Sequence, residues 1–208
     1  MSTISIIGTG NMARTIGTLA VAGGNTIEVI GRDRSKAADL AKALGANATT
    51  GEFGAIPAGD IVIVALLYAG VVPVVTEYGN ALADKVIVDI SNPFNSTGDG
   101  LAIPGGTSIA QEVAKAAPDS ANVVKAFNTV FQVVLVKGEP LDVFIAGDDE
   151  SAKASVEKFV ESLGLRPLDV GGLKMAHYLE GMGLVAVGLA KHGVGNLDFA
   201  LGVTVPGA

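Results

Sequence analysis

Two glycines near the start of the chain have the spacing that a phosphate-binding turn requires. The apolar run Ile4–Ile7 is followed by the six residues Gly8-Thr9-Gly10-Asn11-Met12-Ala13, and an amphipathic stretch comes next. This order predicts a strand, a tight turn and a helix. Gly8 would let the chain turn sharply, Gly10 would leave room for a pyrophosphate, and the first N–H groups of the helix would point at that anion. The pattern predicts a dinucleotide-binding turn, with an ordinary strand-to-helix turn as the alternative.

Three cations follow the second predicted strand, Thr26–Ile30, where the ribose of a dinucleotide would lie. They are Arg32, Arg34 and Lys36, and Gly31 precedes them. NAD sites usually place an acid there to accept hydrogen bonds from the ribose, whereas a guanidinium can hold a 2′-phosphate in a bidentate fork. We therefore favour NADP(H), bound by these cations, over NAD(H). Asp33 argues for NAD(H). A solvated helix start is a further alternative, although cations there oppose the helix dipole.

The composition limits the kinds of protein and partner. With 208 residues, 49% of them hydrophobic, the chain can bury one core. We expect a single NADP(H)-binding domain over residues 1–208, with residues 173–208 as a C-terminal helical extension. The lack of cysteine and the presence of two histidines argue against metal sites, and a net charge of -7 argues against nucleic acid. No stretch resembles a signal peptide or a membrane helix, so we expect a cytoplasmic protein without a membrane partner.

Strands and helices alternate along the rest of the chain. Strands are predicted at 61–66, 86–90, 122–127, 141–146 and 166–170, and helices at 35–44, 71–82, 107–116 and 149–163. The alternation predicts a Rossmann-type α/β fold with a doubly wound, mostly parallel sheet. Tyr68–Gly70, Ser91–Asn95 and the pair Asn128-Thr129 should form loops at the edge where such sheets bind ligands. Pro73 should lie in the first turn of its helix.

The segment from Leu173 to about Lys191 is helical in length and apolar on most faces. It contains Gly181, Gly183 and Gly188, although glycine inside a helix costs about 1 kcal/mol relative to alanine. Close helix packing would explain these glycines, and close approach of a flat ligand is the alternative. Gly181 and Gly188 lie seven positions apart on one face, which suggests a partner helix. If a second copy of the chain supplies that helix, the protein is a homodimer, as we expect.

Several stretches together resemble the NADPH-dependent F420 reductases, small Rossmann proteins that pass a hydride between NADP(H) and a deazaflavin. The resemblance covers nearly the whole chain. It rests on the stretches Ile7–Met12, Gly31-Arg32 with Lys36, Val124–Thr129, Ala146–Asp149 and Gly164–Gly171, the last being the most family-specific. It implies NADP(H) and coenzyme F420 as cofactors. Pyrroline-5-carboxylate reductases share the Gly-Asn-Met-Ala turn but carry a longer C-terminal helical domain, and so resemble the chain less.

The resemblance also implies roles for individual residues. Thr9–Met12 would contact the pyrophosphate, and Gly31, Arg32 and Lys36 would contact the 2′-phosphate. The stretches Leu66-Leu67-Tyr68 and Asn92-Pro93-Phe94 would approach the ribose and the nicotinamide, and Asn128-Thr129 would lie near the face of hydride transfer. Leu67, Tyr68 and Asn128 stand where one family member has proline, tryptophan and histidine. These differences leave the second substrate open.

No side chain stands out as a catalytic acid. Reduction of a carbonyl needs a proton donor, normally His, Lys or Tyr. His177 and His192 fall in the C-terminal helical segment. Tyr68 could equally be an aromatic residue of a lid, and Lys125 could equally have a structural role. Hydride transfer between two cofactor rings needs stacking and exclusion of water instead. The missing acid therefore favours an NADP-dependent oxidoreductase of the F420 type, with no catalytic residue and no metal. A reductase of flavin or ferric iron and a non-catalytic NADP(H)-binding module are the alternatives.

Overall fold

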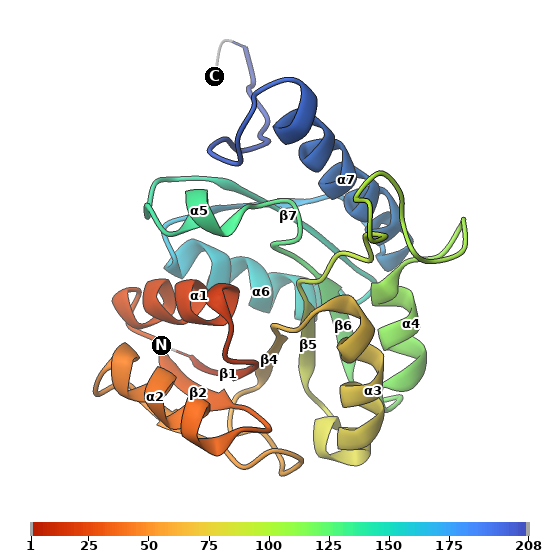
Figure 1. The fold of residues 1–208 in the computed structure, drawn as a ribbon. Coiled ribbons are helices and arrows are strands. Elements are labelled where there is room, and N and C mark those ends of the chain that lie inside the picture. Colours follow the sequence, from red (N-terminus) through yellow and green to blue (C-terminus); the bar gives the residue numbers. More distant parts are fainter. Residues whose placement is uncertain (1, 207–208) are drawn as a thin grey trace.

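A single sheet of eight strands runs through the protein (Figure 1), and the computed structural model describes residues 2–206. In chain order the strands are β1 (Thr3–Ile7), β2 (Thr26–Ile30), β3 (Ala48–Thr50), β4 (Ile61–Val64), β5 (Val86–Asp89), β6 (Asn122–Lys125), β7 (Asp142–Gly147) and β8 (Arg166–Asp169). Their order in the sheet is β3-β2-β1-β4-β5-β6-β7-β8. The pairs are parallel except for β6 with β7, which is antiparallel. The predicted Rossmann-type fold is confirmed.

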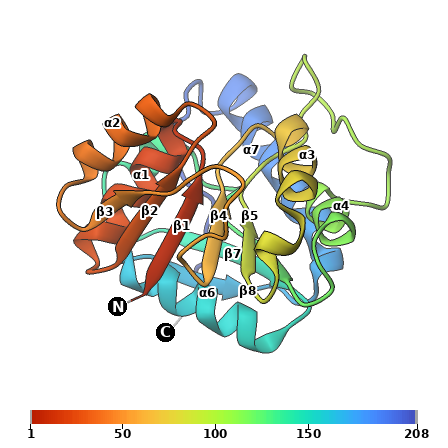
Figure 2. The same ribbon diagram turned by 90° about the horizontal axis from the view of Figure 1, so that it is seen from below.

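Helices cover both faces of this sheet (Figure 2). They are α1 (Asn11–Ala22), α2 (Arg34–Leu44), α3 (Tyr68–Tyr78), α4 (Ile109–Ala116), α5 (Gln132–Leu135), α6 (Glu150–Ser162) and α7 (Ala176–His192), with 3-10 turns η1 (Gly79–Leu82) and η2 (Leu173–Met175). Apolar side chains of α1, α2 and α6 pack in one core with Ile4 and Ile6 of β1. Those of α3 and α4 pack in a second core with Ile7. The sheet is therefore buried on both faces.

Strand β4 is apolar at every position because it is buried on both faces of the sheet. Ile61 and Ile63 belong to the core on the side of α1, whereas Val62 and Val64 belong to the core on the side of α3. Successive side chains of a strand point to opposite faces, so a strand covered on both sides needs apolar residues at every position. Its carboxyl end is thereby fixed beside that of β1, where a parallel sheet of this kind binds ligands.

The start of α3 differs from the prediction. Tyr68–Gly70 forms the first turn of this helix rather than a loop, and Pro73 lies inside the helix rather than in its first turn. The first four N–H groups of any helix lack a partner within it, so Pro73 removes only one further bond. Burial of Val71, Val74 and Val75 against the sheet offsets that loss. The N-terminus of α3 therefore lies at the carboxyl end of β4, at the edge of the sheet where ligands bind.

The predicted C-terminal helical extension is helical over η2 and α7, which end at His192, whereas residues 193–206 form turns and irregular structure. A Cβ at Gly183 would lie 2.9 Å from Asn92 Oδ1, so close packing explains this glycine. At Gly181 and Gly188 a Cβ would meet no atom within 4 Å. Among residues 2–206, no helix is both long enough and apolar enough to cross a membrane.

Candidate functional site

The turn after β1 requires glycine at its first position. Gly8 has a φ of +134°, and a Cβ there would lie 2.3 Å from the carbonyl oxygen of Ala65. Gly10 has an ordinary extended conformation, with φ -79°, and a Cβ there would meet no atom within 4 Å. Gly8 is thus needed by the fold, whereas Gly10 leaves open space in front of α1.

The N-terminus of α1 has no side-chain cap: among the described residues, no side chain accepts a hydrogen bond from its first turn, and the same holds for α3, α5 and α7. By contrast, Asp33 caps α2, Ser108 caps α4 and Asp149 caps α6. The first N–H groups of a helix need acceptors and carry the positive end of its dipole. The space beside Gly10 therefore fits an anion such as a pyrophosphate.

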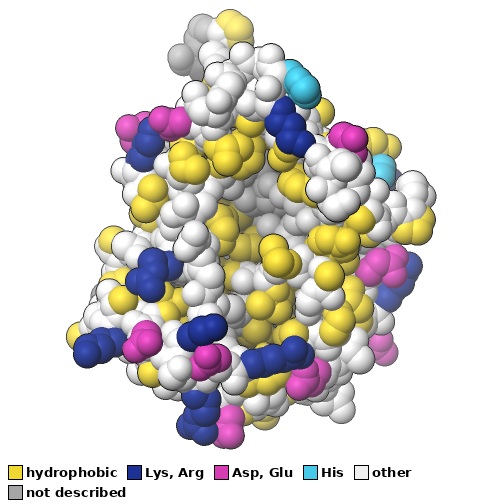
Figure 3. Space-filling model, in the orientation of Figure 1, with side chains coloured by type: hydrophobic (Ala, Val, Ile, Leu, Met, Phe, Trp, Pro, Cys, Tyr) yellow, Lys and Arg dark blue, Asp and Glu magenta, His cyan; other side chains and the backbone are white. Residues whose placement is uncertain are grey.

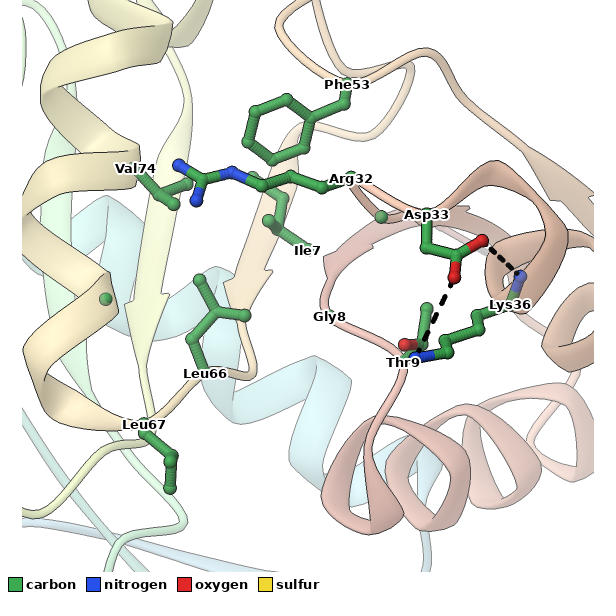
Figure 4. Close-up of a pocket in the computed structure, with 12 residues that line it drawn as sticks. Ile7, Gly8, Thr9, Arg32, Asp33, Lys36, Phe53, Leu66, Leu67 and Val74 are labelled. Carbon is green, nitrogen blue, oxygen red and sulfur yellow. Dashed lines mark hydrogen bonds and ion pairs between the residues drawn. The ribbon is translucent and has the colours of Figure 1, made fainter.

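A cavity of about 400 Å³ lies on one side of this turn (Figure 4), and we name it the adenine-end cavity after the part of the dinucleotide that the sequence predicts there. Of the predicted site residues, Gly8, Thr9, Gly31, Arg32, Lys36, Leu66 and Leu67 line it. Arg32 reaches across it, with its guanidinium carbon 5.1 Å from the centre of the Phe53 ring. Its Nη2 donates to Glu77 Oε2 at 2.8 Å. Arg34 does not line this cavity but a neighbouring hollow beside Thr50 and Glu52.

Asp33 places a carboxylate among these cations. Its Oδ1 accepts hydrogen bonds from the backbone N–H groups of Ser35 and Lys36, at 3.0 and 3.3 Å, and from the Ser35 hydroxyl at 2.7 Å. The hydroxyl contact, followed by the Lys36 amide, lowers the pKa of Asp33. Lys36 Nζ lies 3.8 Å from Asp33 Oδ2. The start of α2 is therefore capped by the protein's own acid, and Arg32 and Lys36 form exposed ion pairs, from which a phosphate can draw them.

Two further cavities continue the site along the carboxyl ends of the strands. The second, of about 440 Å³, is lined by the predicted residues Gly10, Asn11, Met12, Leu66, Leu67, Tyr68 and Asn92. The third, of about 220 Å³, is lined by Asn128 and by the aromatic rings of Phe94, Phe127 and Phe131.

Leu66 and Leu67 border the first two cavities, and Met12, Asn92 and Phe94 border the last two. Pro93 is buried and is absent from these linings, whereas its neighbour Phe94 is present. Figure 3 shows the hollow on this face, edged by hydrophobic side chains, with Lys and Arg below it.

Asn92 and Asn128 are joined between the second and third cavities. Asn92 Nδ2 donates to the carbonyl oxygen of Asn128 at 2.7 Å, and Asn128 Nδ2 donates to Asn92 Oδ1 at 2.9 Å and to the carbonyl oxygen of Leu179 at 2.8 Å. Asn128 Oδ1 and Thr129 Oγ1 are buried without a hydrogen-bond partner among the described residues. Buried polar atoms are normally paired. Their unused capacity fits a ligand with a polar edge in the third cavity.

Phe127 gives the loop after β6 its direction. The strand was predicted to reach Phe127 but ends at Lys125, and Phe127 has a φ of +60°. A bulky residue rarely adopts this conformation, which costs on the order of 1–3 kcal/mol and tends to occur at functional sites. The ring is 1% exposed and stacks edge-on with Phe159 at 6.4 Å, so packing holds it in place. The turn brings Asn128 to the cavity.

A buried charge cluster lies beneath the second cavity, and sequence reasoning missed it. Lys125 Nζ donates to Asp89 Oδ2 at 2.7 Å, to Glu180 Oε1 at 2.9 Å and to the carbonyl oxygen of Ser91 at 2.6 Å. The three charged side chains are 0% exposed. Glu180 also accepts from the Ile109 amide, and burial raises the pKa of its carboxyl although Lys125 opposes the shift. The cluster ties β5, β6, α4 and α7 together at the edge that holds Ser91, which lines the second cavity.

Neither histidine belongs to the three cavities in the part of the chain that the structure describes. His177 Nδ1 lies 2.7 Å from the carbonyl oxygen of Thr107, and His192 ends α7. The second and third cavities carry Tyr68 as the one ionisable side chain among their described linings.

Residues 3–93 match the family model described as NADP oxidoreductase, coenzyme F420-dependent. This match spans less than half of the chain, and within it the chain carries the sequence pattern of that family. The match covers β1 to the loop after β5, which includes Gly8, Gly10, Arg32 and Asn92. The predicted resemblance to NADP-dependent oxidoreductases of this family is confirmed.

Relatives extend this likeness beyond residue 93. Metalloreductase STEAP3 from Rattus norvegicus is 30% identical over 188 residues, which are 87% of this chain and 36% of the relative. The chain thus spans about a third of that protein. A solved structure of a candidate F420-dependent NADP-reductase from Arthrobacter sp. FB24 has a TM-score of 0.86 at 23% identity. The superposition covers 99% of this chain and 100% of that structure. The structure of pyrroline carboxylate reductase from Plasmodium falciparum, with NADP bound, has a TM-score of 0.62 at 13% identity. That superposition covers 98% of this chain and 71% of the reductase. The two structures share the fold.

Proposed function

We propose that the protein transfers a hydride between NADP(H) and a deazaflavin of the F420 type. The dinucleotide would extend from the adenine-end cavity past Gly10 to the second cavity, and the acceptor would use the third. When bound, the nicotinamide and the acceptor ring supply the redox chemistry. The chain's own residues hold the phosphates, orient the two rings and limit access of water. The bordering residues Met12, Asn92 and Phe94 would keep the rings in contact.

The single observation that carries this proposal is the chemistry of the second and third cavities. Apart from Tyr68, their described linings consist of apolar, aromatic, hydroxyl and amide side chains. Reduction of a carbonyl or imine gains much of its rate from a placed proton donor, whereas transfer between two rings depends mainly on their contact. Reduction of the acceptor also takes up one proton, and because Tyr68 is the one ionisable side chain in these described linings, we assign the supply of that proton to solvent. A flat acceptor ring is therefore favoured.

The acceptor is tested by mixing the protein with NADPH and F420 and following the visible absorbance of oxidised F420. We expect the absorbance to bleach with matching oxidation of NADPH. FMN, FAD and a ferric chelate are tested in parallel with the same protein preparation. Bound NADPH with no bleaching of F420 would contradict the deazaflavin proposal while leaving the nucleotide site standing.

The preference for NADP(H) is tested by Arg32→Ala, with Arg34→Ala as a matched control. Arg32 lines the adenine-end cavity, whereas Arg34 lines the neighbouring hollow. We expect Arg32→Ala to weaken NADPH binding by roughly 1.5–3 kcal/mol, the worth of a charge-assisted contact, and to leave NADH binding nearly unchanged. Arg34→Ala should affect NADPH binding much less. Titration calorimetry measures both nucleotides. Equal losses for NADPH and NADH would remove the assignment of Arg32 to the 2′-phosphate.

A second candidate function is NADPH-dependent reduction of flavin or ferric iron. The 30% identity to Metalloreductase STEAP3 favours it. Turnover of FMN, FAD or the ferric chelate without turnover of F420 would select it in the experiment above. Binding of NADPH with no acceptor reduced would select a non-catalytic NADP(H)-binding module instead.

We also propose that two copies of the chain pair through the outer face of α7. Tyr178 and Val185 are 66% and 60% exposed on this helix, and nothing in the described chain fills the space beside Gly181 and Gly188. Light scattering coupled to gel filtration tests the homodimer, and a monomeric mass at micromolar concentration would contradict it. The cytoplasmic location stays a prediction.

A further inference from the structure

The end of α3 holds Arg32 by two routes. Glu77 Oε2 accepts a hydrogen bond from Arg32 Nη2 at 2.8 Å. The next residue, Tyr78, packs edge-on against Phe53 with ring centres 5.3 Å apart, and Phe53 in turn lies against the Arg32 guanidinium. Figure 4 shows Arg32 extended between Phe53 and Val74. The guanidinium is thereby held over the adenine-end cavity from its far wall.

Each of the two cations that line this cavity is paired with a carboxylate, but the two carboxylates differ in what else they bind. Asp33 faces Lys36 and also caps α2 through two backbone amides, so it has a role in the fold. For the carboxylate of Glu77, Arg32 is the one hydrogen-bond partner among the described residues. Arg32 and Glu77 are 65% and 50% exposed, and such pairs contribute little to stability. Glu77 can therefore release Arg32 at small cost.

We propose that Glu77 sets how strongly the protein prefers the 2′-phosphorylated dinucleotide, by competing with the phosphate for Arg32. The inference rests on the proposed binding of NADP(H). A phosphate that reaches Arg32 must displace the carboxylate and then remains close to it, so the two negative groups repel each other. A dinucleotide with free ribose hydroxyls brings no phosphate to this point. Glu77 should therefore weaken NADPH binding selectively and moderate the preference for it.

The test is Glu77→Gln, which keeps the size of the side chain and removes its charge. Glu161→Gln is the matched control, because Glu161 is exposed on α6 away from the cavities and its loss changes the net charge equally. Dissociation constants for NADPH and NADH are measured by titration calorimetry at two salt concentrations. We expect Glu77→Gln to bind NADPH about three- to ten-fold more tightly, because the repulsion between the carboxylate and the 2′-phosphate is removed. The gain should shrink at high salt, because salt screens that repulsion. NADH binding should stay within about two-fold.

The outcomes separate this inference from the proposed function. Wild-type protein that prefers NADPH, with an unchanged or weaker NADPH affinity in Glu77→Gln, would overturn the role of Glu77 and leave the nucleotide site intact. A weaker affinity would mean that Glu77 presents Arg32 to the phosphate rather than competing with it. An equal gain in Glu161→Gln would reduce the effect to net charge and would also overturn the inference. Wild-type protein that binds neither nucleotide would overturn both proposals.

Discussion

The two ends of the candidate site carry charges under opposite conditions. At the adenine end, Arg32 and Glu77 are paired in water, with side chains 65% and 50% exposed. At the acceptor end, Lys125 and its two acids, Asp89 and Glu180, are 0% exposed. Exposed pairs are worth about 0–1 kcal/mol and can exchange partners, whereas breaking a buried pair costs about 3–5 kcal/mol. The adenine end is thus suited to exchange its own acid for a ligand, and the acceptor end is suited to stay fixed.

The fixed end also positions the groups that would face the two rings. Lys125 binds the carbonyl oxygen of Ser91, and the Ser91 hydroxyl donates to Asp89 Oδ1 at 2.7 Å. Asn92 follows directly and bonds to Asn128 across the site. The loop after β5 therefore depends on the cluster beneath it for its position. Contact between two rings tolerates little displacement, which gives a physical reason to hold this loop rigidly.

The largest expected effect is on stability. Lys125→Met keeps the apolar stem and removes the ammonium, which leaves two buried carboxyls without their cation. We expect the free energy of unfolding to fall by about 3–5 kcal/mol in urea titrations. Arg32→Met, the control at the exposed end, should change it by less than about 1 kcal/mol. Equal losses in the two variants would remove the contrast between the two ends.

The next largest effects come from the two glycines of the turn after β1, where one substitution should affect stability and the other nucleotide binding. Gly8→Ala forces a Cβ to within 2.3 Å of the Ala65 carbonyl oxygen at a φ of +134°, so it should destabilise the protein, by about 1–3 kcal/mol from the backbone conformation alone. Gly10→Val meets open space at an ordinary φ, so its stability should be near that of the wild type. Its side chain would nonetheless occupy the place of the pyrophosphate, and binding of both NADPH and NADH should be lost. Thermal unfolding and calorimetry measure the two properties.

The outcome for Gly10→Val is decisive for the turn. Retained nucleotide binding in a stable Gly10→Val protein would mean that no pyrophosphate lies there. A large loss of stability in this variant would mean instead that Gly10, like Gly8, serves the fold.

Local patterns predicted those parts of the molecule that local interactions determine. The first two strands and the glycine turn are each encoded within a few residues, and the structure has them as expected. The start of α3 was wrong because Pro73 indicated a helix start nearby, whereas packing of Val71 and Val74 on the sheet extends the helix backwards. The edge strand β3 was missed because its sequence, Ala48–Thr50, is short and mostly exposed.

Pairings between distant segments could not be predicted in the same way. Arg32 and Glu77 are 45 positions apart, and Lys125 and Glu180 are 55 apart. The one local sign of the cluster was a charge at the end of each of two apolar strands, Asp89 and Lys125, and a buried strand end with a charge needs a partner. That sign was available but does not identify Glu180. Only the packing of α7 on the sheet edge brings it there.

The smallest expected effect is a difference in pH dependence between the two ends. Burial raises the pKa of Glu180, so its ionisation is less favourable in the folded than in the unfolded protein. Measured against Glu180→Gln, the wild type should be most stable below pH 4.5 and should lose that advantage as the pH rises toward the folded pKa. The hydrogen bond from Ser35 lowers the pKa of Asp33, which gives the opposite sign. Measured against Asp33→Asn, the wild type should keep its advantage above pH 3.8 and lose it as the pH falls. Urea titrations of these isosteric variants between pH 4 and pH 8 should therefore show a slope for Glu180 and almost none for Asp33. A slope of the same sign for both would mean that burial does not separate the two ends of the site.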